Sequence, residues 1–549
     1  MRTKLLSSLF FLFSITAFKQ VKSQMVYENI NSGVYEYLDR MSQKGFIQYH
    51  DLIKPISKSI LYSKLLDLKL IEDKLLLIEQ KELDFYLKKY IASNEKEGDT
   101  VKYLNFKRGL LPTRFFEAKS GNAYINASPV IQFSTNTYSG KSYNQKAWGE
   151  DIWGRIGKHV GFNFSSRDVS ENRTDLTKDS VINNSQMGYV LLTQELVKTK
   201  IINYSEYRAS IGYEWKNGFV SYGQDNLLWG YGFNGKMVLS EKSPYNQYIR
   251  LNYQPFTWFK FDYFHVWLNS NNIDSNNTYG FGNTVYGGQR VNYVAKYLAS
   301  HTATFTPHKG VNISIGESIV YTEKLDLGFL FPIMFYKIYD NNKSNYNILN
   351  GNNSQFFLQI SLKNIIPKAH FYSTLLIDEI KISKIFDENQ SRNHLGFNLG
   401  LQVNDLGIRY LSWYGEYTRV NPFVYTNLNP AQNYTSYGYN LGDWVGNNFD
   451  RKIMGIKYTP LPRLKLELRY QDIKKGPTYS AEQQYLQIPS KKFLETVVYA
   501  QTQYLFSFNY EFTNNMYLVG NSNKTTTRNE FYNAIYINNN YSLGVKIGL

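Results

Sequence analysis

The sequence predicts an all-β transmembrane barrel that follows an export signal and a small helical domain. Three observations support this prediction. The first residues form a secretory signal, residues 25 to about 92 have helical periodicity, and from about residue 101 to residue 549 apolar and polar side chains alternate with a period of two. Such alternation gives each strand two faces with different surroundings, as in an antiparallel barrel with lipid outside and water inside.

Residues 1–24 have the features of a signal peptide. Arg2 and Lys4 form a short basic region, and residues 5–18 are apolar apart from Ser and Thr. Val21 and Ser23 have the spacing of a cleavage site, so the mature chain is expected to begin near residue 24. No later stretch reaches the roughly 18 uncharged apolar residues of a membrane-spanning helix. Any membrane insertion must therefore use strands.

The composition favours a barrel and excludes several kinds of site. Aromatic residues make up 17% of the 549 residues, with 48 Tyr and 35 Phe, although the mean hydropathy is −0.42. Tyr and Trp rings suit the lipid–water boundary of a barrel, but an AT-rich genome also enriches Tyr and Phe. The absence of Cys excludes a disulfide framework, a thiolate zinc site, a Cys nucleophile and a lipobox lipid anchor.

The chain is basic, with a formal net charge of +16. Removal of the signal, which has four basic residues and no acid, leaves +12. A basic protein attracts polyanions, and for an exported chain acidic polysaccharide or the phosphates of outer-membrane lipid are better partners than nucleic acid. Charge scattered over a solvated surface explains the same number, so the charge alone identifies no partner.

Residues 25–100 predict three short amphipathic helices and a polar linker. Gly45 is expected to end the first helix, and Pro55 with Ser57 to begin the second. Residues 93–99 are polar and form the linker. The apolar positions of the three stripes are Val34, Tyr37, Leu38 and Met41, then Leu61, Leu65 and Leu68, then Leu76, Leu83, Leu87 and Tyr90.

The clearest strands lie in the C-terminal part. Residues 464–471 alternate without exception, and residues 358–363, 259–263 and 504–512 follow the same pattern. Residues 541–549 alternate up to the terminus, as the closing strands of outer-membrane barrels do, although Leu549 stands in place of the usual aromatic residue. Residues 269–277 and the stretch with Asn521 and Asn523 predict external loops. A secreted β-sandwich is the competing fold.

Several segments, taken in chain order, resemble the capsule assembly protein Wzi family. Residues 34–40 and 54–57 are similar to the start of that family, and residues 229–232 resemble its Trp-Gly-Pro-Gly segment, with Tyr231 in place of proline. The best match is residues 416–425. Shorter matches are residues 297–301, 316–321, 376–379, 433–435 and 441–442.

The resemblance implies an outer-membrane barrel of about 18 strands, a number within the range of bacterial barrels, with a periplasmic three-helix bundle. It also implies a lectin-like role, in which the barrel holds capsular polysaccharide at the cell surface. The mature chain then divides into a periplasmic helical domain, residues 25–100, and a barrel, residues 101–549. The barrel-assembly machinery is expected as a partner during biogenesis.

The positions that match the family motifs are the candidates for polysaccharide contact: Trp229, Glu416, Tyr417, Arg419 and Tyr434. An Arg side chain binds carboxylates with two donors, and aromatic rings stack on sugar faces, so Arg419 and Tyr434 suit an anionic sugar. Alternation places Glu416 on one face of a strand and Tyr417 on the other. The simpler interpretation is an ion-pair network or a ring of interface residues around Glu416, and a tight turn at Trp229.

Two other functions compete with a non-enzymatic polysaccharide-binding barrel. One is a porin or transport channel. The other is a hydrolase, in which Glu317 with Asp378 or Glu379 forms a glycosidase pair. Asp378 and Glu379 are adjacent in a strand and point to opposite faces, so acids that balance basic residues of the lumen are the simpler interpretation.

No motif predicts a cofactor. Gly230, Gly232 and Gly235 spell G-x-G-x-x-G, but residues 236–239 look extended rather than helical, which argues against a dinucleotide site. The sequence has no H-E-x-x-H and no G-x-S-x-G motif. We therefore expect neither a metal nor an organic cofactor, and no enzymatic activity.

Overall fold

A computed structural model gives the structure of the chain. It describes residues 25–91, 100–103, 115–138, 140–172, 201–280, 288–343, 351–380, 382–387, 389 and 392–549. The predicted signal peptide and the whole of the predicted linker, residues 93–99, lie outside these residues.

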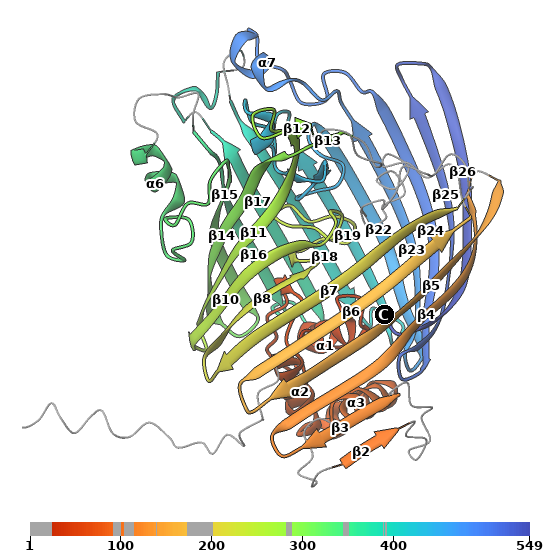
Figure 1. Cartoon of the computed structure of the whole chain (residues 1–549). Helices are drawn as coiled ribbons and strands as arrows, with labels where there is room; N and C mark the ends of the chain where they lie inside the picture. Colours follow the sequence, from red (N-terminus) through yellow and green to blue (C-terminus); the bar gives the residue numbers. More distant parts are fainter. Residues whose placement is uncertain are drawn as a thin grey trace, which may run out of the picture.

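In the described part of the chain, eighteen long antiparallel strands form a closed barrel (Figure 1). The last strand closes on the first, with Ile547 opposite Ile131 and Ser542 opposite Asn136. The strands are β4 (Ala123–Tyr138), β5 (Lys141–Ile156), β6 (Val160–Glu171), β7 (Ile202–Trp215), β8 (Gly218–Asp225), β10 (Asn246–Phe256), β11 (Phe259–Ile273), β14 (Tyr293–His308), β15 (Val311–Thr322), β16 (Asn353–Lys363), β17 (Ala369–Glu379), β18 (His394–Asn404), β19 (Leu411–Val420), β22 (Phe449–Leu461), β23 (Leu464–Lys475), β24 (Tyr499–Thr513), β25 (Met516–Asn529) and β26 (Ala534–Ile547).

The two faces of the wall differ as the alternation predicts. In β16, Gln359 and Ser361 point into the lumen and are 1% exposed, whereas Leu358 and Ile360 point outward. Many other outward side chains are apolar and exposed, including Ile315 at 57% and Leu543 at 57%. An apolar outer face around a polar interior is the surface of a membrane-spanning barrel rather than of a secreted sandwich.

The two ends of the barrel differ in their connections. At the end where the helices lie, the strands join through short turns, such as Gly310 between β14 and β15. At the other end the connections are longer, for example residues 226–245 and 421–448. We call these the helical end and the loop end (Figure 1).

Three helices lie at the helical end: α1 (Gly33–Gln43), α2 (Lys58–Lys69) and α3 (Leu77–Ile91). Gly45 has φ +78° just after α1, and the Ser57 hydroxyl accepts a hydrogen bond from Ile60 N at 3.4 Å, as the sequence predicts. The apolar stripes meet in one core, in which Leu38, Leu61 and Leu83 are fully buried. No helix in the described ranges is long and apolar enough to cross a membrane.

The helices and the residues before α1 contact the barrel rather than standing apart from it. The Tyr27 hydroxyl lies 2.8 Å from Ser221 Oγ on β8, Arg40 donates to Ser412 Oγ on β19 at 3.1 Å, and Arg463 N donates to Glu82 at 2.8 Å. The smaller strands and helices of the described fold are β1 (Ile53–Lys54), β2 (Thr100–Tyr103), β3 (Phe116–Ser120), β9 (Leu228–Trp229), β12 (Tyr279–Gly280), β13 (Gln289–Arg290), β20 (Thr435–Ser436), β21 (Tyr439–Asn440), α6 (Tyr336–Lys343), α7 (Ala481–Leu486) and the 3-10 helices η1 (Glu72–Lys74), η3 (Ile382–Lys384) and η4 (Pro430–Gln432).

The loop prediction for the Asn-rich stretches is wrong at most positions. Asn521 and Asn523 lie within β25, and residues 269–273 belong to β11, so only residues after Ile273 form a turn. The physical reason is that amide side chains suit a wet barrel lumen as well as a loop, so composition does not separate the two.

Candidate functional site

Three segments of the chain fill one half of the lumen. They are the N-terminal residues 25–57, the β8–β10 connection 226–245 and the β19–β22 connection 421–448, which we call the plug. In the plug, β1 pairs with β9 so that Ile53 lies opposite Trp229. The apolar side chains of the plug and of the surrounding wall form one large core, which includes Met25, Tyr27, Leu52, Ile53, Trp229, Met237, Val424, Leu441, Trp444, Phe264, Phe357 and Ile473.

Hydrogen bonds join the two inward-folded connections. Tyr425 OH donates to Met237 O at 2.8 Å, and Trp444 Nε1 donates to Asn234 O at 2.7 Å. Ser240 N donates to Leu441 O at 2.7 Å. Because buried backbone groups are expensive to leave unpaired, these contacts fix the plug in one arrangement.

A buried ion cluster ties the plug to the wall. Arg451 of β22 reaches Asp443 in the plug, with Nη2 2.7 Å from Oδ2 and Nη1 3.0 Å from Oδ1. The same guanidinium lies 3.5 Å from Glu416 of β19. Glu416 also accepts hydrogen bonds from Tyr372 OH at 2.6 Å and from Phe233 N at 3.0 Å. A side chain at Gly235 would strike Asp443 and Arg451, because an added Cβ would lie 2.3 Å and 2.8 Å from their atoms.

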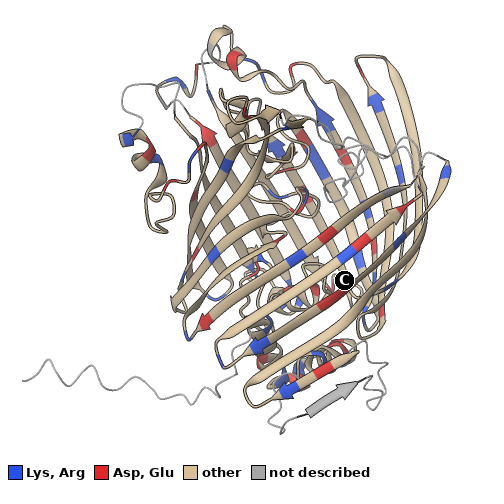
Figure 2. Cartoon of the chain, in the orientation of Figure 1, with Lys and Arg blue, Asp and Glu red and all other residues tan. Residues whose placement is uncertain are grey.

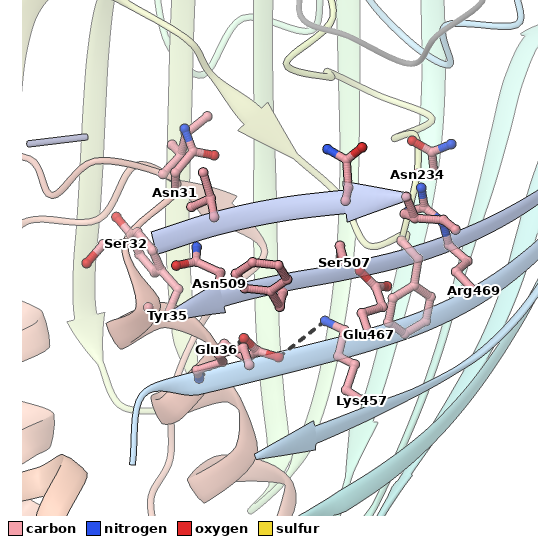
Figure 3. Close-up of a pocket in the computed structure, with 18 of the residues that line it drawn as sticks. Asn31, Ser32, Tyr35, Glu36, Asn234, Lys457, Glu467, Arg469, Ser507 and Asn509 are labelled. Atoms are coloured by element: carbon pink, nitrogen blue, oxygen red, sulfur yellow. Dashed lines mark ion pairs between the residues drawn. The ribbon is translucent and has the colours of Figure 1, made fainter. Parts of the chain in front are cut away.

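The other half of the lumen is a cavity of about 1040 Å³. It lies between the plug, which includes α1, and wall residues of β22 to β26, β4 to β7 and β17 to β19. Figure 3 shows part of its lining, including Glu36, Lys457 and Asn509. Thirteen Asn or Gln residues line it, together with nine acids and nine Lys or Arg residues. The equal numbers mean that the cavity has no net charge of either sign, and Figure 2 likewise shows both signs scattered over the chain. The cavity is therefore not a single-sign track for a polyion.

Some of the charges on the cavity surface are paired across it. Glu36 of α1 extends from the helix toward the wall, where it lies 3.4 Å from Lys457 Nζ (Figure 3). Its carboxylate also lies 3.3 Å from Lys465 Nζ. Burial raises the pKa of Glu36, but the two ammonium groups outweigh burial and hold this pKa at about 2. Asp39, deeper beside Lys54, has a pKa that burial raises to about 6.

The wall of the cavity is rich in amide side chains. Among the described residues, Gln503 Oε1 on β24 and Asn540 Oδ1 on β26 accept no hydrogen bond, although both atoms are buried from bulk solvent. Asn509, Asn521 and Asn523 line the same side of the cavity. Aromatic side chains, including Tyr143 and Tyr231, line it elsewhere. An amide offers a donor and an acceptor together, which matches the hydroxyl groups of a sugar.

Three of the five predicted site residues are buried in or against the plug. Trp229 is 1% exposed, donates from Nε1 to Gln359 Oε1 at 3.1 Å and packs on Phe264 with 5.4 Å between ring centroids. Tyr434 is also 1% exposed, and its hydroxyl donates to Val238 O at 2.7 Å. Glu416 belongs to the ion cluster. None of these three residues lines the cavity.

The other two predicted residues are on the outer face of the wall. Tyr417 packs near Phe397, with 5.9 Å between ring centroids. The Arg419 guanidinium lies 3.8 Å from the centroid of the Phe493 ring and donates to Asn421 Oδ1 at 3.0 Å. The structure therefore does not bring the five residues together on one surface, and their contact with sugar stays a prediction.

Sequence reasoning missed the amides of β24 to β26. Their signal is Asn or Gln at alternate positions, as in Asn521 and Asn523, but only the closed barrel shows which face of the strand is the lumen. In the described part of the chain no cluster of three or more His, Asp or Glu residues is placed to hold a metal.

No protein-family model and no curated protein matches the sequence. Among solved structures, the chain is similar to Wzi of Escherichia coli, described as an outer-membrane protein involved in Group 1 capsule assembly and as a carbohydrate-binding β-barrel. The match covers 96% of this chain and 100% of that chain, with a TM-score of 0.60 and 11% sequence identity. This chain has the Wzi fold. Because so few residues are identical, the likeness to Wzi establishes the fold alone.

Two further solved structures match less closely. OccK8 (OprE) of Pseudomonas aeruginosa gives a TM-score of 0.41 at 9% identity, with 77% of this chain and 97% of that chain covered. OccAB2 of Acinetobacter baumannii gives 0.43 at 9% identity, with 78% and 97% covered.

Proposed function

We propose that this chain is an outer-membrane barrel that binds surface polysaccharide and acts in capsule attachment or assembly, with its helical end in the periplasm. The observation that carries the proposal is the amide-lined cavity beside a plugged half of the lumen. The shared fold with Wzi, which its description calls a carbohydrate-binding barrel, supports the same reading. Outer-membrane lipid surrounds the wall, and the barrel-assembly machinery inserts it.

The chemistry of the cavity suits a glycan. Each sugar hydroxyl is both donor and acceptor, which amides such as Asn509 and Asn523 match, and Tyr rings provide surfaces for the apolar faces of sugars. Such contacts are individually weak. A polymer with many copies of one sugar unit gains from repeated encounters with the same site, because each unit that dissociates is replaced by a neighbour at high local concentration.

The channel alternative makes a different prediction. The plug fills half of the lumen and is held by the Arg451 cluster, so we expect negligible ion conductance in planar bilayers. A porin would conduct through an open lumen. Stable conductance steps with the purified wild-type protein would favour the channel.

We also propose that the chain is not a hydrolase. Glu317 of β15 points to the outer face, whereas Asp378 of β17 points into the lumen and accepts a hydrogen bond from Tyr425 N at 2.6 Å. These two carboxylates lie on opposite sides of the wall and do not share a substrate. Glycan turnover by the purified protein that is lost in Asp378→Asn would contradict this proposal.

The test of the proposed function pairs two measurements. Purified barrel is titrated with capsular polysaccharide from the encoding organism, and cell-bound capsule is measured in a deletion strain with and without the complementing gene. We expect binding in the first measurement, and in the second a loss of cell-bound capsule that complementation restores. A deletion strain with normal cell-bound capsule, together with no binding in vitro, would remove the proposal.

A further inference from the structure

Residues 323–343 form a segment that folds back over the outside of the barrel wall, and we call it the outer segment. It follows β15 and includes α6, which lies outside the wall beside β14 and β15 (Figure 1). The carboxylate of Glu317 on β15 accepts hydrogen bonds from Tyr336 N at 2.9 Å and Lys337 N at 2.6 Å, at the start of α6.

Glu317 points outward, as the register shows. Its neighbour Gly316 pairs with Phe357, whose ring packs on Trp229 in the lumen with 5.2 Å between centroids. Because neighbours in a strand point to opposite faces, Glu317 and its cross-strand partners His301 and Phe356 face the membrane side. The anchor of the outer segment is therefore on the outer face.

The wall beneath the outer segment has an unusual composition for a membrane-facing surface. His265 Nε2 lies 2.8 Å from Tyr321 OH, and Tyr263 OH donates to Phe329 O at 3.1 Å. His265 is 0% and Glu317 is 2% exposed, because the outer segment covers them. A bare carboxylate and imidazoles on the lipid side would be expensive, so this patch requires a cover.

The opposite side of the outer segment is strongly apolar. Its exposed apolar side chains are Leu327 at 75%, Ile333 at 72%, Ile338 at 56%, Phe331 at 52%, Phe335 at 51% and Leu325 at 42%, whereas its exposed polar residues lie at its two ends, at 323–324 and 341–343. The Phe335 ring lies 5.9 Å from that of Phe356, an outward residue of β16. The apolar side of the segment is therefore continuous with the apolar outer face of the wall.

We propose that the outer segment is a lipid-contacting element, and that its partner is the acyl chains of the leaflet at the loop end. The inner side of the segment covers the polar patch of the wall. Its outer side presents to the lipid the apolar surface that the wall lacks at this patch. The inference rests on the barrel spanning a membrane and is independent of glycan binding, so failure of either leaves the other standing.

The absence of native Cys allows a direct test with single nitroxide labels. Ile333→Cys is labelled in the full chain, reconstituted in vesicles of phosphatidylcholine and phosphatidylglycerol, and its collision rates with oxygen and with a water-soluble nickel complex are measured. Ile315→Cys on the wall and Leu486→Cys on α7, which are 57% and 83% exposed, serve as the lipid and water references. We expect Ile333→Cys to match Ile315→Cys, with low nickel and high oxygen accessibility. A match to Leu486→Cys would overturn the proposal.

A second variant tests the anchor. Glu317→Leu removes the acceptor of the two α6 amides and leaves a side chain that lipid tolerates, so nickel accessibility at Ile333→Cys should rise. The matched control is Asp378→Leu, which removes a carboxylate that also accepts a loop amide, but on the lumen side. An equal rise in nickel accessibility in both variants would contradict the role of Glu317 as the anchor of the outer segment. Dipolar coupling between labels on different chains would instead show that a second copy covers the segment, and would overturn the lipid partner.

Discussion

The two halves of the lumen have the same kind of β-strand wall, but one half holds an apolar plug and the other half is a polar cavity. The wall from β8 to β19, with residues of β22 and β23, packs against a plug with a dry core, in which Trp229 and Leu441 are at most 1% exposed. The polar cavity of about 1040 Å³ is bordered mainly by the wall from β22 through β26 to β7, together with residues of β17 to β19. The comparison teaches that alternation builds the wall, whereas connections that fold inward decide which half is sealed and which half stays accessible to a ligand.

The largest expected effect is on the sealed half. Arg451→Met leaves Asp443 and Glu416 as buried carboxylates without their cation, so we expect a loss of about 3–5 kcal/mol in the free energy of unfolding. Urea unfolding in lipid vesicles measures it. The matched change Arg469→Met, at a cavity-facing position, should cost less than about 1 kcal/mol. Equal losses of unfolding free energy for the two variants would contradict the difference between the plugged half and the cavity half.

A second variant separates packing from recognition. Tyr434→Phe removes the hydroxyl that donates to Val238 O and leaves that buried carbonyl unpaired, which costs about 1–3 kcal/mol. Because Tyr434 does not line the cavity, glycan affinity should stay unchanged when the variant is titrated below its unfolding transition. Weaker binding with unchanged stability would mean that Tyr434 contacts sugar after all.

The cavity half should show the opposite pattern. Gln503→Leu and Asn523→Leu each remove hydrogen-bond capacity from the cavity wall, so glycan affinity should fall by roughly 3- to 10-fold, the equivalent of one hydrogen bond. Titration calorimetry measures the Kd, and urea unfolding should give wild-type stability. An unchanged Kd for both variants would show that the glycan does not bind at β24 and β25.

The smallest expected effect is the dependence on pH of the contact between α1 and the cavity wall. The pKa of Glu36 is held at about 2, below its ordinary value, so its pairing with Lys457 and Lys465 contributes stability above the ordinary pKa of a Glu side chain. This contribution decreases as the pH falls toward 2. Solvent screens this partly exposed carboxylate, so the difference between wild type and Glu36→Gln should be small and should vanish at low pH. If the stability difference between wild type and Glu36→Gln grew as the pH fell, it would contradict a stabilising pairing of Glu36 with the two lysines.

Much of the wall was predictable from local pattern. The alternation of residues 464–471 lies inside β23, and the cap at Ser57 and the glycine at Gly45 lie where the helix signals place them. These features depend on neighbours in the chain, which is why sequence alone reveals them.

The contents of the lumen were not predictable in the same way. The pairing of Ile53 with Trp229 and the approach of Arg451 to Asp443 join distant parts of the chain, and no local period encodes them. Trp229 and Tyr434 tie the plug together through contacts with Gln359 of the wall and Val238 O of the plug, and neither contact has a local signal in the sequence. The outer segment has a local signal in the apolar residues between 325 and 335, but only the register at Glu317 shows that it folds over the wall.

Hydroxyl-radical footprinting with and without capsular polysaccharide tests the central claim most directly. Tyr143 lines the cavity on β5, whereas Tyr504 on β24 points outward and is 57% exposed. With the full chain in lipid vesicles, polysaccharide should slow the oxidation of Tyr143 and leave that of Tyr504 unchanged. Protection of neither tyrosine at saturating polysaccharide, or equal protection of both, would contradict a glycan site in the open half of the lumen.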